Sequence, residues 1–154
     1  MPSSTKTLQG THTDISIQHY ADSVLVIVTQ MGKVGNLVQV SLPATVPVTP
    51  SAPDPLQPNL PKLPSPPIAI QLVPLLGAAS SDHVQTLHNL YASQIATIVW
   101  LADSESPLQV SRKKVIVGIA LRKSGENGES ELSEAERVTF YGVMSALQEL
   151  LHQD

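Results

Sequence analysis

Apolar residues recur along this chain with two periods, and each period predicts a different kind of element. Two short runs, at residues 24–28 and 115–121, are apolar at every position except one glycine. They are too short to cross a membrane and rich in β-branched side chains, so they predict strands buried on both faces. Alternation of apolar and polar residues, or a short apolar run before a proline, predicts further strands at residues 13–20, 37–42 and 68–73. Pro74 limits the last of these to an edge of the sheet, or ends it.

A turn bracketed by two glycines follows the first apolar run. Gly32 and Gly35 enclose this turn, and a strand follows it at residue 37. Such a turn predicts that the two flanking strands form a hairpin at the centre of the fold. The two glycines are expected to provide backbone geometry.

Three- and four-residue spacing of apolar positions predicts two helices. The first carries its apolar face from Val84 to Ala102. Its far end, residues 95–101, is rich in β-branched residues and leaves a strand as the alternative, but the period favours a helix. The second helix begins at a capping box, in which Ser133 caps the first turn and Glu136 reaches back. Its apolar stripe contains Phe140, Val143, Met144, Leu147, Leu150 and Leu151.

The element order is therefore ββββαβα, and the fold class is α+β. We expect a two-layer domain of five or six mostly antiparallel strands with two helices on one face. Two helices cover only one face of such a sheet, whereas its central strands are apolar on both. Because exposing the second face would be costly, we expect a partner to pack on it. Val26 or Val117, whichever points away from the helices, is the candidate for this dimer interface.

Length and proline content set the domain organisation. The chain has 154 residues, which fits one domain. Residues 1–10 are polar and are expected to form a disordered tail, and residues 11–154 a single domain. Ten of the 13 prolines lie within residues 43–67, which predicts an extended, mobile insertion loop. A PxxP pattern at residues 61–64 leaves open a docking role for this loop.

Charge and composition exclude several classes of partner. The net charge is −4, and the few basic residues are scattered, so nucleic-acid binding is not expected. The chain has no cysteine, which excludes disulfides and thiolate metal sites. No apolar segment resembles a secretory signal or a membrane span, so we expect no membrane partner and a location in the cytoplasm or the nucleus.

No arrangement of residues predicts catalysis or a bound cofactor. Lys33 stands in a glycine turn, but a strand follows it and the nucleotide-binding pattern G-x-x-x-x-G-K-[ST] is absent. No serine occurs in G-x-S-x-G. The five histidines show no spacing that would bring metal ligands together, and Pro2 lies too far from the first strand to serve as a base. We therefore expect a protein that is not an enzyme, with no cofactor and no metal.

The glycine turn and its flanking strands resemble the signature region of the proteasome assembly chaperone 3 family. In that region a hydrophobic strand ends in V-T-Q-x-G-K-x-G, and the downstream order of helix, strand and helix is similar as well. The matching positions in this chain are Val28, Thr29, Gln30, Gly32, Lys33 and Gly35. The long proline-rich segment departs from typical members, in which this connection is short.

The resemblance implies an ATP-independent assembly chaperone for the 20S proteasome. Such a chaperone acts as a dimer, with a paralogous chaperone or with itself, in which the two sheets pack together. The dimer binds a proteasome α-subunit, promotes formation of the α-ring and then dissociates. At the exposed tip of the turn, Gln30, Met31 and Lys33 are the candidate contact residues. The alternatives are a roadblock-like or longin-like dimeric scaffold in a trafficking or signalling complex, and a small-molecule-binding enzyme.

Overall fold

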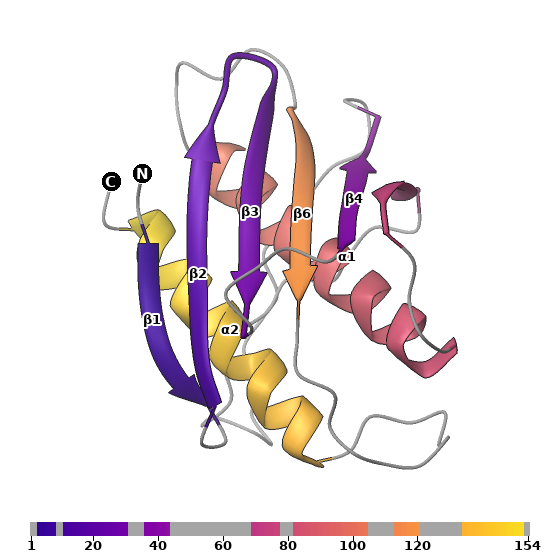
Figure 1. Cartoon of the computed structure of the whole chain (residues 1–154). Helices are drawn as coiled ribbons and strands as arrows, with labels where there is room; N and C mark the ends of the chain where they lie inside the picture. The colour runs from indigo at the N-terminus through magenta and orange to yellow at the C-terminus, as the bar shows by residue number, and fades with distance from the viewer. Residues whose placement is uncertain are drawn as a thin grey trace, which may run out of the picture.

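The computed structural model describes residues 3–8, 11–30, 36–43, 69–77, 82–104, 113–120 and 134–152, and Figure 1 shows the whole chain. These residues form one six-stranded sheet and two helices in two layers, which confirms the predicted α+β class. The elements are β1 (Ser3–Leu8), β2 (Thr11–His19), β3 (Ser23–Thr29), β4 (Asn36–Ser41), β5 (Gln71–Leu76), α1 (Asp82–Ser104), β6 (Lys114–Ala120) and α2 (Glu134–His152). The predicted order is found from β2 onward, with one more strand in front of it.

The strands lie in the order β1-β2-β3-β6-β4-β5 across the sheet. Neighbouring strands are antiparallel except for β3 and β6, which are parallel. Strands β3 and β6 come from the two apolar runs and occupy the middle of the sheet, where burial is greatest. Strand β5, which contains Pro74, lies at an edge, where a residue without an N–H is tolerated.

The predicted central hairpin is wrong. Strands β3 and β4 do not pair, because β6 lies between them, parallel to β3 and antiparallel to β4. Strands β3 and β4, although consecutive in the chain, are therefore not neighbours in the sheet. A short connection usually makes neighbours of two strands. Here β6, which comes from the second apolar run, lies between the two strands instead.

The first ten residues were expected to be a disordered tail, and this is also corrected. Residues Ser3–Leu8 form β1, which pairs antiparallel with β2 from Ser3↔Ser16 to Leu8↔Thr11. The segment is polar, so it lacks the apolar alternation from which strands are recognised. An edge strand with one solvated face needs little of that pattern, since backbone hydrogen bonds to β2 hold it.

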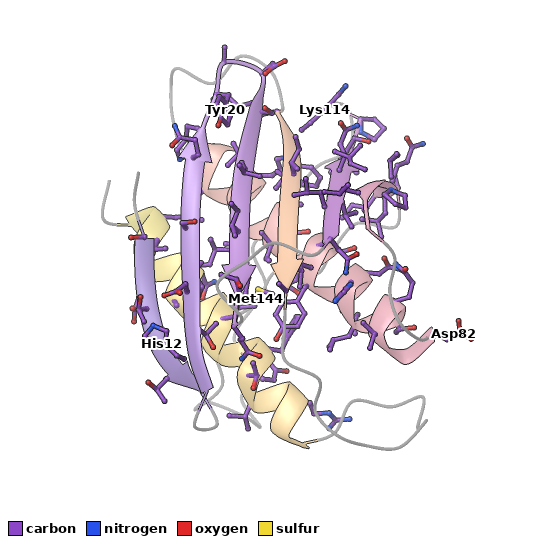
Figure 2. All side chains as sticks on the ribbon, viewed as in Figure 1. His12, Tyr20, Asp82, Lys114 and Met144 are labelled. Atoms are coloured by element: carbon purple, nitrogen blue, oxygen red, sulfur yellow. The ribbon has the colours of Figure 1, made fainter. Side chains whose placement is uncertain are left out.

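Both helices cover the same face of the sheet (Figure 1). Helix α1 packs on β6, β4 and β5, and α2 packs on β1 and β2. The helices also contact each other, where the Tyr91 and Phe140 rings meet edge to face with centroids 5.1 Å apart. Met144 lies between α2 and the sheet (Figure 2) and is fully buried. The helical reading of residues 95–101 is thereby confirmed.

The core lies between the helices and one face of the sheet. Alternate residues of the strands enter it, as the two-residue period requires. The indole Nε1 of Trp100 donates to the carbonyl oxygen of Lys113 at 2.7 Å, which fastens the end of α1 to the start of β6. The strand residues of the core that are completely or almost completely buried are Ile15, Ile17, Val24, Val26, Val28, Val38, Val40, Val115, Val117 and Ile119.

Val26 and Val117 do not lie at an outer interface. They are register partners in β3 and β6, and both are completely buried in the core beneath the helices. Because their strands are apolar at consecutive positions, sequence alone did not distinguish the two faces. The interface candidates therefore move by one residue, to the side chains on the other face of the same strands.

Candidate interaction surface

The face of the sheet opposite the helices carries no other element among the described residues, and we call it the open face. Figure 1 is viewed from this side, with both helices behind the sheet. Register partners share a face, so the pairings arrange the residues of the open face in rows across the strands. The Gly118 row contains Ser16, Ile27, Gly118, Leu37 and Leu76, and the Ile116 row contains Gln18, Leu25, Ile116, Gln39 and Val73.

Over β3, β6, β4 and β5, the two rows of the open face are apolar except at Gln39. We define the apolar patch as Leu25, Ile27, Leu37, Val73, Leu76 and Ile116. Four of these residues are partly exposed, and Val73 and Leu76 are 45% and 57% exposed. They come from four adjacent strands, so they lie next to one another on the sheet. Contiguous apolar surface of this kind marks an interaction site in a soluble protein, because removing it from water contributes about 25 cal/mol per Å².

The other half of the open face, over β1 and β2, is polar. Asp14 accepts a hydrogen bond from the Thr5 hydroxyl at 2.7 Å and lies 3.4 Å from Nε2 of His12. The side chains of His12 and Asp14 are 68% and 48% exposed. In Figure 2, His12 lies near the end of the sheet where β1 leads into β2, and Lys114 lies toward the opposite end, where β6 begins. Exposed polar contacts of this kind contribute little to stability, but they give the open face a polar border.

The residues predicted from the glycine turn are only partly tested. Gln30 belongs to the fold more than to a free tip, because its backbone N–H donates to the Ala120 carbonyl at 2.8 Å and its amide Nε2 donates to the Thr13 hydroxyl at 3.0 Å. Met31, Gly32, Lys33 and Gly35 lie outside the described residues, as does the proline-rich segment between residues 43 and 69.

The described part of the chain holds no group of three or more His, Cys, Asp or Glu side chains that could bind a metal ion. It also holds no helix that is long and apolar enough to cross a membrane. The open face is therefore the candidate interaction surface of the described residues.

One buried polar pair joins α1 to β4. Asn36 Nδ2 lies 3.2 Å from Nδ1 of His88, whose side chain is 6% exposed. Burial lowers the pKa of His88 from its ordinary value near 6.5, because the charged imidazolium loses its hydration. A neutral ring can accept the Asn36 hydrogen bond at Nδ1, whereas a protonated ring has no acceptor.

This lowered pKa predicts that the protein loses stability in mild acid. The unfolded chain binds a proton at His88 more readily than the folded chain. The contribution of His88 to stability is therefore complete above about pH 6.5. It is lost as the pH falls below that value, through the lowered pKa that His88 has in the folded chain. Melting temperatures between pH 8 and pH 5 should fall for the wild type and fall less for His88→Gln.

A matched control for this experiment is His12→Gln. This variant removes an exposed histidine and leaves the contact between His88 and Asn36 in place. If the melting temperatures of the wild type and His88→Gln fell equally between pH 8 and pH 5, the assignment of the pH dependence to His88 would be contradicted.

The residues that the sequence did not single out are those of the apolar patch. Leu25, Ile27 and Ile116 lie beside the named Val26 and Val117, within runs of consecutive apolar residues. The only signal that separates the two sets is the register of β3 and β6 relative to β2, whose Ser16 and Gln18 are polar. Following that alternation across the sheet would have placed Ile27 and Leu25 on the outer face.

Comparison with known proteins gives one informative result. No model of a protein family matches the chain, and no curated protein does. Among solved structures, the chain is similar to a protein in the crystal structure of a novel chaperone complex for yeast 20S proteasome assembly, with a TM-score of 0.53 and 11% sequence identity. The similarity covers 97% of each chain. The chain therefore has, over nearly its whole length, the fold of a component of a proteasome assembly chaperone complex.

Proposed function

We propose that this protein is an ATP-independent assembly chaperone for the 20S proteasome, of the type of proteasome assembly chaperone 3. The observation that carries the proposal is the shared fold over 97% of both chains with a component of a yeast proteasome assembly chaperone complex. The resemblance of residues 28–35 to the family's signature turn supports it independently, because that resemblance rests on sequence and the fold comparison does not.

In this proposal the chain acts as one half of a dimer, with a paralogous chaperone or a second copy of itself. The apolar patch is the surface through which the two sheets pack. Two sheets that pack face to face lie about 10 Å apart and interdigitate their side chains. The helices lie on the opposite face of each sheet and do not take part in the dimer interface.

The dimer then binds a proteasome α-subunit, promotes α-ring formation and dissociates, without using a nucleotide. Met31 and Lys33 remain the candidate contacts with that subunit. Gln30 is a weaker candidate for this contact than Met31 or Lys33, because its side-chain amide donates a hydrogen bond to the Thr13 hydroxyl. We place the protein in the cytoplasm or the nucleus, where proteasomes are assembled.

Depletion of the protein tests the function directly. Proteasome intermediates are followed on native gels, and the loss of the chaperone should reduce complete α-rings and accumulate free α-subunits. The full-length wild-type chain, used to capture proteins from native extract, should retain proteasome α-subunits and no mature particle.

Re-expression of the wild type after depletion is the control and should restore the rings. Normal ring formation together with no captured α-subunit would refute the proposal. Capture of a trafficking complex instead would favour the scaffold reading.

A further inference from the structure

Two side-chain amides stand at the ends of the connection between β3 and β4. Gln30 directly follows β3, and Asn36 is the first residue of β4. Each amide contacts an element that is distant in the sequence. Nε2 of Gln30 donates to the Thr13 hydroxyl of β2 at 3.0 Å, and Nδ2 of Asn36 lies 3.2 Å from Nδ1 of His88 in α1. The two ends of the connection are therefore tied to two different parts of the fold.

Both ends are also tied to β6. The backbone N–H of Gln30 donates to the Ala120 carbonyl at 2.8 Å. Asn36 pairs with Ile119, and β4 lies on the other side of β6 from β3. Ile119 and Ala120 are the last two residues of β6, and both are buried. The two ends thus lie beside the same strand end, which fixes where the connection begins and where it finishes.

The partners of the two amides are buried. Thr13 is completely buried and His88 is 6% exposed, while Gln30 and Asn36 are themselves partly buried. A hydrogen bond between buried polar groups is costly to break, because water does not take the place of the lost partner. Both contacts therefore restrain the side chains at the ends of the connection.

We propose that Gln30 and Asn36 are positioning residues, which hold the ends of the connection between them for docking on a proteasome α-subunit. This inference rests on the proposed function, in which Met31 and Lys33 of the connection contact that subunit. The two amides act through their bonds inside the fold. Fixing both ends of a short segment lowers the conformational entropy that the segment loses on binding, and such preorganisation raises affinity.

A role in stability alone gives a different expectation, and Thr97 provides the comparison. Thr97 is completely buried, like Thr13, and its hydroxyl donates to the Ser93 carbonyl at 2.7 Å within α1. Loss of this hydroxyl removes a buried hydrogen bond without changing either end of the connection. The same substitution at Thr13 and at Thr97 therefore separates positioning from stability.

The test measures docking of the purified full chain on the α-subunits of the 20S proteasome, each produced singly. Thr13→Val replaces the hydroxyl that accepts from Gln30 by a methyl group, and it should weaken docking about five- to tenfold. Thr13→Ser keeps the hydroxyl and should dock like the wild type. At the other end, His88→Leu removes the acceptor for Asn36 and should weaken docking to a similar degree. His88→Gln keeps an acceptor and should weaken it less.

A second measurement needs no α-subunit. Trypsin cleaves after Lys33, and under native conditions this cleavage should be several-fold faster in Thr13→Val and His88→Leu than in the wild type. Gln30→Met removes the first bond from its other side and should have the same effect. In the double variant Thr13→Val with Gln30→Met the two effects should not add, because both substitutions remove one bond.

The matched control is Thr97→Val. It should lower the melting temperature, followed by the fluorescence of Trp100, as Thr13→Val does, and it should leave docking and cleavage after Lys33 unchanged. If Thr13→Val changed docking or cleavage no more than Thr97→Val, the inference would be overturned, and the proposed function would stand because the wild type still docks. A wild type that binds none of the α-subunits would refute the proposed function and the inference together.

Discussion

Val117→Asp should abolish folding of this protein. Val117 is completely buried at the centre of the sheet, on the face that the helical layer covers, and pairs with the equally buried Val26. No lysine or arginine is buried among the described residues. A carboxylate placed there loses its hydration without gaining a partner, which costs about 4–5 kcal/mol or more. That is comparable with the whole stability of a typical domain, about 5–15 kcal/mol.

The measurement is thermal unfolding followed by Trp100, the only tryptophan of the chain, which is 3% exposed. The variant should show the red-shifted emission of an exposed indole and no cooperative transition. The neighbouring variant Ile116→Asp is the matched control, because it puts the same carboxylate one residue away on the open face and should remain folded. A cooperative transition for Val117→Asp within a few degrees of the wild type would contradict the placement of Val117 in the core.

Ile27→Asp should have the opposite effect, leaving the fold intact and destroying association. Ile27 is partly exposed in the middle of the apolar patch, so its carboxylate remains hydrated in the monomer. In a dimer that packs on the open face, the same carboxylate would be buried without a partner. A penalty of about 3 kcal/mol weakens binding about a hundredfold.

Two readouts separate these effects. The melting temperature should change little, whereas capture of partner chains from native extract by the variant should fail. Val138→Asp is the control, since Val138 is an apolar residue on α2 with 44% exposure, away from the open face. Undiminished capture by Ile27→Asp would show that the open face is not the interface.

Much of the fold follows from local patterns, and the remainder depends on long-range pairing. The helices were predictable because Leu87, Tyr91 and Ile95 recur at helical spacing and all become buried. The strand order was not, because no local signal tells β6 to enter between β3 and β4. Strand β1 was missed since a polar edge strand depends on its neighbour and carries little pattern of its own.

The open face was likewise predictable only in part from the sequence. That a partner should cover one face followed from strands with apolar residues at every position. Which residues meet that partner did not follow, because in such strands a shift by one residue exchanges the two faces. Val26 and Ile27 are equally apolar, and only the pairing with β2 separates the core residue from the surface residue.

The parallel pairing of β3 with β6 also determines when this protein can fold during its synthesis. Strand β6 begins at Lys114, which pairs with Ser23, so the two halves of the sheet join only after most of the chain has left the ribosome. Strands β1, β2 and β3 form an antiparallel meander that can assemble early. Strands β4 and β5 pair with each other but must wait for β6. Until then β3 has an unpaired edge and apolar residues without their partners from β6, and surface of this kind is prone to aggregate during synthesis.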